Sequence, residues 1–577
     1  MLYKAFVNGS LIAIDRKINV MQSTQNKKSS KIGLLILSIV VILVIGGIWH
    51  WNTHKKGLIK EEIVKTVNKK SNGLYTIEYG NLELNEATGN LSISNVSITY
   101  DSTKMQKLLD DKNAPARIFK ITADSIVVTG VKTPKALLDK EVVASTLFFA
   151  HPTIEIINTK QENDSLNNIP HKEIYEQLLG NLKLIKIDSI KLQNASLIVR
   201  NIKAKKHSLD MPNFDITMGQ VLVDSISAND KSRLLFAETL TASSKKISWD
   251  SKDGLYQYQI KELQLNSSIN EASIDSFFLQ PNYSEEAFMK QYETQVDRYH
   301  FNLYNIQIKA LQFADLINNK FIAGQVTMNN SSFKIYHDLN MPPNTKSKVG
   351  NYPQQALMKI QLPIFIQKLS VSNSFVEYKE KNAKTKMDGK VQFYNADATV
   401  NNVTNMKEKI KGNNKLIVDM KTDFLDKIPF TAKWTMYLMN PEGKFNIIGN
   451  MQAFDATVLN KVTEPMGPAK IESGNIKSIK FDLTGTNHAM DGNISILYDD
   501  LKVSLLKKDG DEEDDKLKKK KIASIAANFF IKNSNPQKGK EVRVTPVHYE
   551  RDATRSIFSL IWKSIFTGAK DNIGLKN

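Results

Sequence analysis

Histidines and carboxylates are the side chains of this chain with the clearest potential for chemistry, because its 577 residues include no cysteine. Only His50 and His54 of the nine histidines are one helical turn apart, and no carboxylate lies beside them. Asp499 and Asp500 fall on a predicted strand, where neighbouring side chains face opposite ways. No nucleophile-elbow, zinc-protease, P-loop or dinucleotide-binding motif occurs. We therefore expect no catalytic residues, no metal site and no cofactor, and predict that the protein is not an enzyme.

The absence of cysteine also excludes disulfides, thiolate zinc sites and iron–sulfur clusters. Carboxylate pairs of the glycosidase type need no local motif, so a hydrolase stays open as an alternative. Lysine and arginine exceed aspartate and glutamate by 78 to 60, a net charge of +18, but the charges are interspersed along most of the chain. No nucleic-acid-binding signature accompanies them. We expect membrane lipids, anionic phospholipids in particular, and not nucleic acid, as partners.

An uncharged apolar run at residues 32–48 predicts a membrane anchor, because with the following tryptophans it approaches the length of about 20 residues that spans a bilayer. No cleavage site follows the run, which indicates that the anchor is retained. Lysines flank both sides, but long domains cross the membrane largely regardless of charge, so we place residues 1–31 in the cytoplasm. Met21 is an alternative start of the chain, because residues 1–20 give no targeting signal. The predicted anchor residues are Ile32, Leu35, Val40, Val44, Ile48, Trp49 and Trp51.

Beyond the anchor, apolar and polar residues alternate with a period of two through most of the chain, which predicts short β-strands. A local pattern recurs around Asn194, Asn330 and Asn373, each followed by a small residue and a second alternating segment. Asparagine tolerates the left-handed conformation of tight turns and bulges, so the pattern predicts a strand, a corner and a second strand.

Apart from a short continuation of the anchor helix through residues 58–67, helices are predicted at 134–140, 171–182, 283–296 and 456–462, and near the end of the chain. In residues 551–577 the apolar side chains form two ridges at i, i+4 spacing, one through Ile557 and one through Phe558. Ser559, Lys563 and Thr567 lie opposite these ridges. This amphipathic helix is expected to cap the sheet or to rest on a membrane surface.

These features resemble the AsmA-like envelope proteins, relatives of the bridge-type, repeating β-groove lipid carriers. The resemblance is carried by the anchor, by Leu91–Tyr100 and Ile121–Val131, and by the alternating segments Gly474–Thr486 and Met490–Leu506. It divides the chain into a cytoplasmic tail, an anchor, an AsmA-like N-terminal unit, a middle groove region, an AsmA-like C-terminal region and the final helix. The respective limits are 1–31, 32–51, 52–160, 161–400, 401–550 and 551–577.

The resemblance implies a mainly β body, in the form of an elongated, curved antiparallel sheet with a few short helices. It also implies anchoring in a bacterial inner membrane, a periplasmic location and transport of lipid along an apolar groove in support of the outer membrane, with envelope proteins as further partners at the C-terminal end. A scaffold for outer-membrane biogenesis that carries no cargo is the main alternative, and an anchored hydrolase is the third. Period-two alternation fits an open groove and a closed β-sandwich equally. The candidate groove residues are Ile190, Leu192, Val326, Met328, Leu369 and Val371.

Overall fold

The computed structural model describes residues 64–574, except 66, 70, 86, 133–138, 160–181, 203–206, 228–229, 231, 384–385, 467–468 and 506–531. The predicted anchor at 32–51, the cytoplasmic tail and the alternative start at Met21 lie outside the described residues. Among the described helices, none combines the length and the apolar character needed to cross a membrane.

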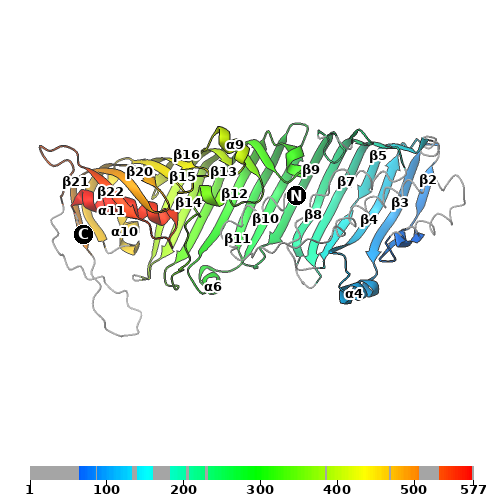
Figure 1. Cartoon of the computed structure of the whole chain (residues 1–577), viewed down its shortest axis with the longest axis horizontal. Helices are drawn as coiled ribbons and strands as arrows, with labels where there is room; N and C mark the ends of the chain where they lie inside the picture. The colour runs from blue at the N-terminus through cyan, green and yellow to red at the C-terminus, as the bar shows by residue number, and fades with distance from the viewer. Residues whose placement is uncertain are drawn as a thin grey trace.

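The protein is mainly β, and its strands form one long curved sheet of 22 strands. Figure 1 shows the strands side by side along the long axis of the molecule, nearly in the order in which they occur in the chain. The exceptions are short strands that share a neighbour: β1 and β2 both pair with β3, β5 and β6 both lie between β4 and β7, and β18 and β19 both pair with β20. At about 4.8 Å between neighbours, such a sheet extends for roughly 90 Å. The strands are β1 (Tyr75–Glu78), β2 (Leu82–Asn85), β3 (Asn90–Tyr100), β4 (Arg117–Thr129), β5 (Glu141–Ala150), β6 (Thr153–Asn158), β7 (Leu184–Asn201), β8 (His207–Val223), β9 (Thr239–Asp250), β10 (Tyr256–Asn266), β11 (Glu271–Pro281), β12 (Asp297–Lys309), β13 (Phe321–Asp338), β14 (Ile364–Lys381), β15 (Asp388–Thr404), β16 (Lys415–Phe424), β17 (Ile428–Tyr437), β18 (Phe445–Met451), β19 (Phe454–Asp455), β20 (Ala469–Gly485), β21 (Ala489–Leu505) and β22 (Val544–Glu550).

Most neighbouring strands are antiparallel, as predicted, but the pairs β5–β7, β6–β7 and β13–β14 are parallel. A parallel pair needs a connection that returns to the starting end of the sheet. Residues 339–363 make this return between β13 and β14, and we call them the strap. From its prolines and polar residues, the sequence predicts only a surface loop at 339–355, because pairing direction depends on contacts between distant residues.

The recurring asparagines have the predicted left-handed backbone, with φ of 49° at Asn194, 53° at Asn330 and 45° at Asn373. They do not separate two strands, however. Each lies inside one continuous strand, and the pairing register shifts next to it. The pattern therefore marks β-bulges, and bulges bend a strand and increase its twist. Asparagines with similar positive φ occur at other positions in strands, namely Asn95, Asn213, Asn305, Asn395 and Asn402.

Several helices lie at the ends of the strands, most of them near the edges of the sheet in Figure 1. The predicted helix at 283–296 is confined to five residues, that at 456–462 forms a 3-10 turn and a short helix, and the other two internal predictions fall largely outside the described residues. The helix at 102–110 escaped prediction because it is short and has a single buried residue, Met105. The helices are α4 (Ser102–Asp110), α6 (Glu285–Met289), α7 (Phe313–Ile317), α8 (Pro353–Leu357), α9 (Lys407–Gly412), η4 (Ala456–Leu459), α10 (Asn460–Met466) and α11 (Ile557–Ile573).

Candidate functional site

A row of apolar side chains crosses the sheet from β2 to β22. Directly paired residues of neighbouring strands lie on the same face of a sheet, so pairing partners can be followed from one strand to the next. Every partner along this path is apolar, except for one glycine. The apolar row consists of Leu82, Ile93, Ile126, Phe149, Leu192, Ile216, Ala242, Leu265, Ala272, Ile308, Val326, Leu369, Val400, Val418, Trp434, Ile447, Leu483, Gly492 and Val547.

The residues next to this row in the sequence form a polar row on the opposite face of the sheet. From β7 to β15 the same pairing gives Lys191, Thr217, Thr241, Asn266, Glu271, Lys309, Gln325, Lys368 and Asn401. The sheet thus has an apolar face and a polar face along this stretch. The three large clusters of buried residues include apolar-row members from β3 to β22, and no second sheet covers the apolar face among the described residues.

The structure brings the predicted groove residues into register. Val326 pairs with Leu369 and Met328 pairs with Val371 across β13 and β14. Ile190 and Leu192 pair with Met218 and Ile216 of β8 on the same face. Val326 is buried, whereas the other five predicted residues are half-buried.

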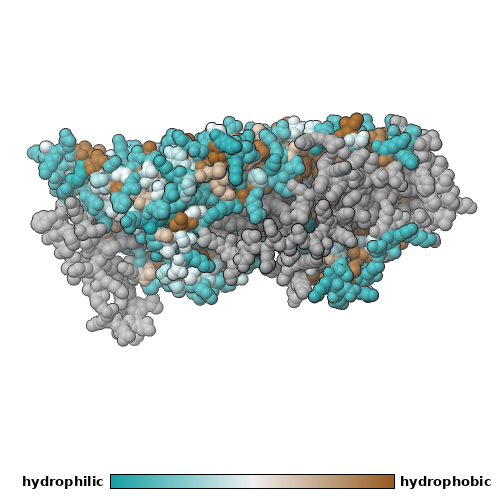
Figure 2. All heavy atoms as spheres, viewed as in Figure 1, coloured by the Kyte–Doolittle hydropathy of each residue, from teal (hydrophilic) through white to brown (hydrophobic). Residues whose placement is uncertain are grey.

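Exposure varies along the apolar row. Its members are half-buried in β7–β10 and again in β14–β17, but buried in β11–β13. Phe313 and Leu316 of α7 belong to the same cluster as Ile308 and Val326, so α7 accounts for part of this burial. Figure 2 shows mostly hydrophilic side chains on the described surface facing the viewer, with small hydrophobic patches between them. The half-buried stretches are the more accessible parts of the apolar row, although α10 contacts β15 within the second of them.

Helix α11 packs against β21 and β22 and covers the end of the apolar row. The face that the helix buries differs from the predicted one. It includes Ser564 and Gly568, while Phe558, which belongs to a predicted apolar ridge, is 52% exposed. A Cβ atom on Gly568 would lie 2.5 Å from Ile494 Cγ2 and 2.6 Å from Val547 Cγ2. The helix therefore approaches the sheet most closely where it has no side chain. The expected capping role is consistent with this arrangement.

The strap crosses the apolar face near the same end. Tyr352 Oη donates a hydrogen bond to the Thr486 carbonyl (2.7 Å), and Gln354 Nε2 donates to the Gly443 carbonyl (2.9 Å). The Arg551 guanidinium lies over the Tyr352 ring at 4.2 Å. The strap thus joins turns of β17–β18 and β20–β21 to β13 and β14, so the sheet curls around its apolar face here.

A small polar pocket lies between the strap, β12–β14 and the start of α11. His337 Nδ1 is 2.9 Å from Asp297 Oδ1, and Lys348 Nζ is 4.0 Å from Asp297 Oδ2. Burial alone would raise the pKa of Asp297, but its hydrogen bond to His337 and its electrostatic interactions with His337 and Lys348 outweigh this and hold the pKa below its usual value. Burial raises the pKa of Tyr378, and the nearby Glu380 carboxylate raises it further. The pocket therefore holds a carboxylate that already has partners within the protein, the His337 ring and the Lys348 ammonium group.

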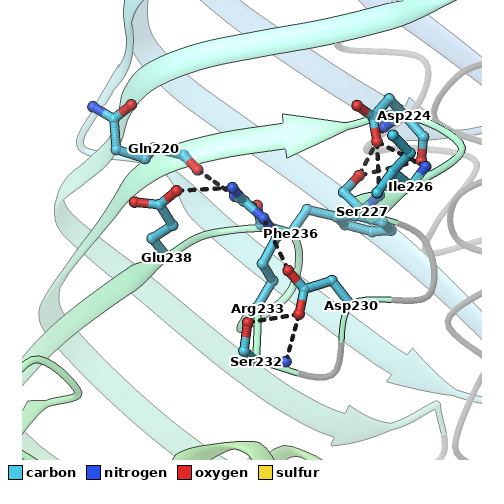
Figure 3. A network of polar contacts seen from close by, with 9 residues as sticks. All are labelled: Gln220, Asp224, Ile226, Ser227, Asp230, Ser232, Arg233, Phe236 and Glu238. Carbon is cyan, nitrogen blue, oxygen red and sulfur yellow. Dashed lines mark hydrogen bonds and ion pairs between the residues drawn. The ribbon is translucent and has the colours of Figure 1, made fainter.

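A second polar cluster holds the connection between β8 and β9 (Figure 3). The Arg233 guanidinium donates to the carbonyls of Gln220 (2.8 Å) and Phe236 (3.0 Å) and pairs with the Glu238 carboxylate (2.8 Å). The Asp224 carboxylate accepts from two backbone amides within its own turn. These bonds hold the loop's own backbone, so we interpret the network as structural.

Among the residues that the structure describes, no three histidine, aspartate or glutamate side chains converge as metal ligands. Neither a scan against models of protein families nor a search of curated proteins finds a match to this chain. The resemblance drawn from the sequence therefore stays a prediction, and the apolar row is the feature on which a function can be argued.

Proposed function

We propose that the protein binds lipids by their acyl chains along the apolar face of the sheet and conducts them between membranes of a bacterial envelope. The observation that carries the proposal is the apolar row, which continues across the sheet opposite a polar row. Transfer along such a face would be differential solvation: an acyl chain gains about 0.8 kcal/mol for each CH₂ group that leaves water. No bond is made or broken, so no catalytic side chain is required.

The same proposal places the body in the periplasm, held at the inner membrane by the predicted anchor, with a role in maintaining the outer envelope. Phospholipids, in particular anionic ones, are the proposed cargo, because their chains fit an apolar face and their headgroups can remain in water. The net charge of +18 suits anionic headgroups.

The covered C-terminal end of the row favours a second candidate function, that of a scaffold. There α11, the strap and the sheet form one cluster of buried residues, as a closed structural core would. The two functions differ in cargo: bound phospholipid is expected of a carrier and not of a scaffold.

Val371→Asp and Ser370→Asp form a matched pair of variants that tests the carrier function. Val371 pairs with Met328 and Ala398 on the apolar face, whereas Ser370 pairs with Thr327 and Thr399 on the polar face. A carboxylate at position 371 should interrupt lipid passage, because a sliding chain would desolvate it at a cost of several kcal/mol.

The measurements are phospholipid that copurifies with the protein in detergent, complementation of an envelope defect, and circular dichroism to verify folding. We expect lipid to be lost from the Val371 variant and kept by the Ser370 variant. Equal tolerance of both substitutions would reject the carrier function. Loss of activity from a single histidine or aspartate substitution in a folded protein would instead favour the hydrolase.

A further inference from the structure

Lysines gather at one end of strands β15–β18, on α9 and in the neighbouring turns. All of them are exposed, and Figure 1 shows α9 at the upper edge of the sheet. We call this group the basic rim: Lys407, Lys409, Lys411, Lys415 and Lys444.

Backbone and ring contacts hold the basic rim together as one surface. The Leu438 amide donates to the Asn414 carbonyl at 2.8 Å, which fixes the β17–β18 turn beside the residues that follow α9. Lys415 and Lys444 lie over the same ring, that of Tyr437, with Nζ at 6.0 Å and 5.5 Å from its centroid. The lysines from the two connections are therefore neighbours in space.

The charge of the basic rim is poorly compensated. Other lysines of the sheet pair with carboxylates, as Lys379 does with Glu285 and Lys477 with Asp499, both within 3 Å. In the described part of the chain, no ion pair includes a lysine of the basic rim. Two carboxylates are near the basic rim in the sequence, Glu408 of α9 and Glu442. Glu442 lies 2.9 Å from His488 and is thus already engaged.

An exposed apolar side chain accompanies these charges. Met439, in the turn between β17 and β18, is 52% exposed and has a φ of 58°. On the inner side, Ile410 of α9 is buried in the cluster that also contacts Val400 and Val418 of the apolar row. The basic rim therefore lies at the strand ends beside a half-buried stretch of the apolar row.

We infer that the basic rim docks on the surface of a bilayer rich in anionic phospholipid and so places this stretch of the apolar face next to the membrane. The inference rests on the proposed lipid-binding function and names the surface where lipid would enter or leave. Lysine ammonium groups are compact point charges that anionic headgroups attract at about 1 kcal/mol each near the surface. An exposed methionine among them suits the boundary between headgroups and acyl chains, and not the surface of a nucleic acid.

The test is capture of vesicles by the full chain held in phosphatidylcholine nanodiscs. One set of vesicles contains phosphatidylcholine alone, and the other contains equal parts of phosphatidylcholine and phosphatidylglycerol. Lys407→Gln, Lys411→Gln and Lys415→Gln are combined in one variant. The matched control combines Lys368→Gln, Lys421→Gln and Lys480→Gln, which remove the same charge from exposed positions adjacent in sequence to apolar-face residues. Met439→Ser is a third variant that leaves the charge unchanged.

We expect the unmodified chain and the control to capture only the anionic vesicles, with capture falling as salt rises. Loss of three interfacial lysines should weaken capture roughly a hundredfold, and the Met439 variant should weaken it less. Equal capture by the rim variant and the control, or capture of neutral vesicles by the unmodified chain, would overturn the inference. Copurified phospholipid is measured separately: its absence from a chain that still captures vesicles would reject the carrier function and leave the docking surface in place.

Discussion

At the scale of single residues, backbone conformation decides which side chains share a face of the sheet. Ile187 and Ile190 contact the same cluster of buried residues although strict alternation would put them on opposite faces. Gln220, on the paired strand between their partners Val221 and Met218, has a φ of 51° and locally interrupts the alternation. Such an interruption requires a residue with positive φ. Asparagine occupies this position at several of the bulges, because its short polar side chain is tolerated in the left-handed region.

Substitution of Asn330 should separate the backbone contribution of a bulge from that of its side chain. Asn330 has a φ of 53°, is exposed, and accepts a hydrogen bond from Asn373 Nδ2 at 2.6 Å. We expect Asn330→Val to cost at least about 1–2 kcal/mol of folding free energy, because a β-branched residue resists positive φ. Asn330→Gly loses the same hydrogen bond but tolerates the backbone, so it should cost less. Urea denaturation followed by tryptophan fluorescence measures both, and equal losses would contradict the role assigned to the backbone.

At the scale of elements, the strands and the last helix could be predicted, but their partners could not. Period-two alternation identifies a strand wherever one face is buried, and i, i+4 ridges identify an amphipathic helix. The parallel pairing of β13 with β14 depends on the strap, whose contacts with Thr486 and Gly443 join residues far apart in the sequence. The burial of Gly568 depends likewise on the shape of the sheet beneath it, which no local pattern records.

Gly568→Val should displace α11 from the sheet. The new Cβ atom would fall within 2.6 Å of methyl groups of Ile494 and Val547, and overpacking of this kind costs about 1–3 kcal/mol. Valine has a higher helix propensity than glycine, so faster hydrogen exchange of the α11 backbone amides would result from poorer packing and not from a weaker helix. Hydrogen exchange of residues 557–573 measures the effect. Lys563→Val, at an exposed position of the same helix, is the control and should leave exchange nearly unchanged; similar exchange in both variants would argue against close packing at Gly568.

At the scale of the whole molecule, the predicted elongated sheet is present, and hydrogen-bonded pairing runs through the predicted limit at residue 400, which falls inside β15. Candidate groove residues chosen from sequence fall on the apolar row or next to it. The continuity of that row was not visible in the sequence, because it appears only when the register of every strand pair is known. The choice between an open face and a sandwich likewise required the arrangement of all the strands.

Solution scattering should distinguish this elongated body from a compact one. A globular chain of this length would have a radius of gyration of about 25 Å. A sheet that extends for roughly 90 Å should give a value well above that. Small-angle neutron scattering with the detergent contrast-matched measures the protein alone, and a value near 25 Å would show that the sheet folds back on itself in solution.

The agreement between the order of strands in the chain and their order in the sheet has a consequence for biogenesis. Most strands pair with the strand that precedes them in the chain, so the growing chain can add strands one after another without waiting for distant segments. The strap is the exception, because its contacts at Thr486 and at residues 551–553 form only after most of the sheet exists. Strands would thus be added sequentially from the first strands onward, and the end covered by the strap and α11 would form last.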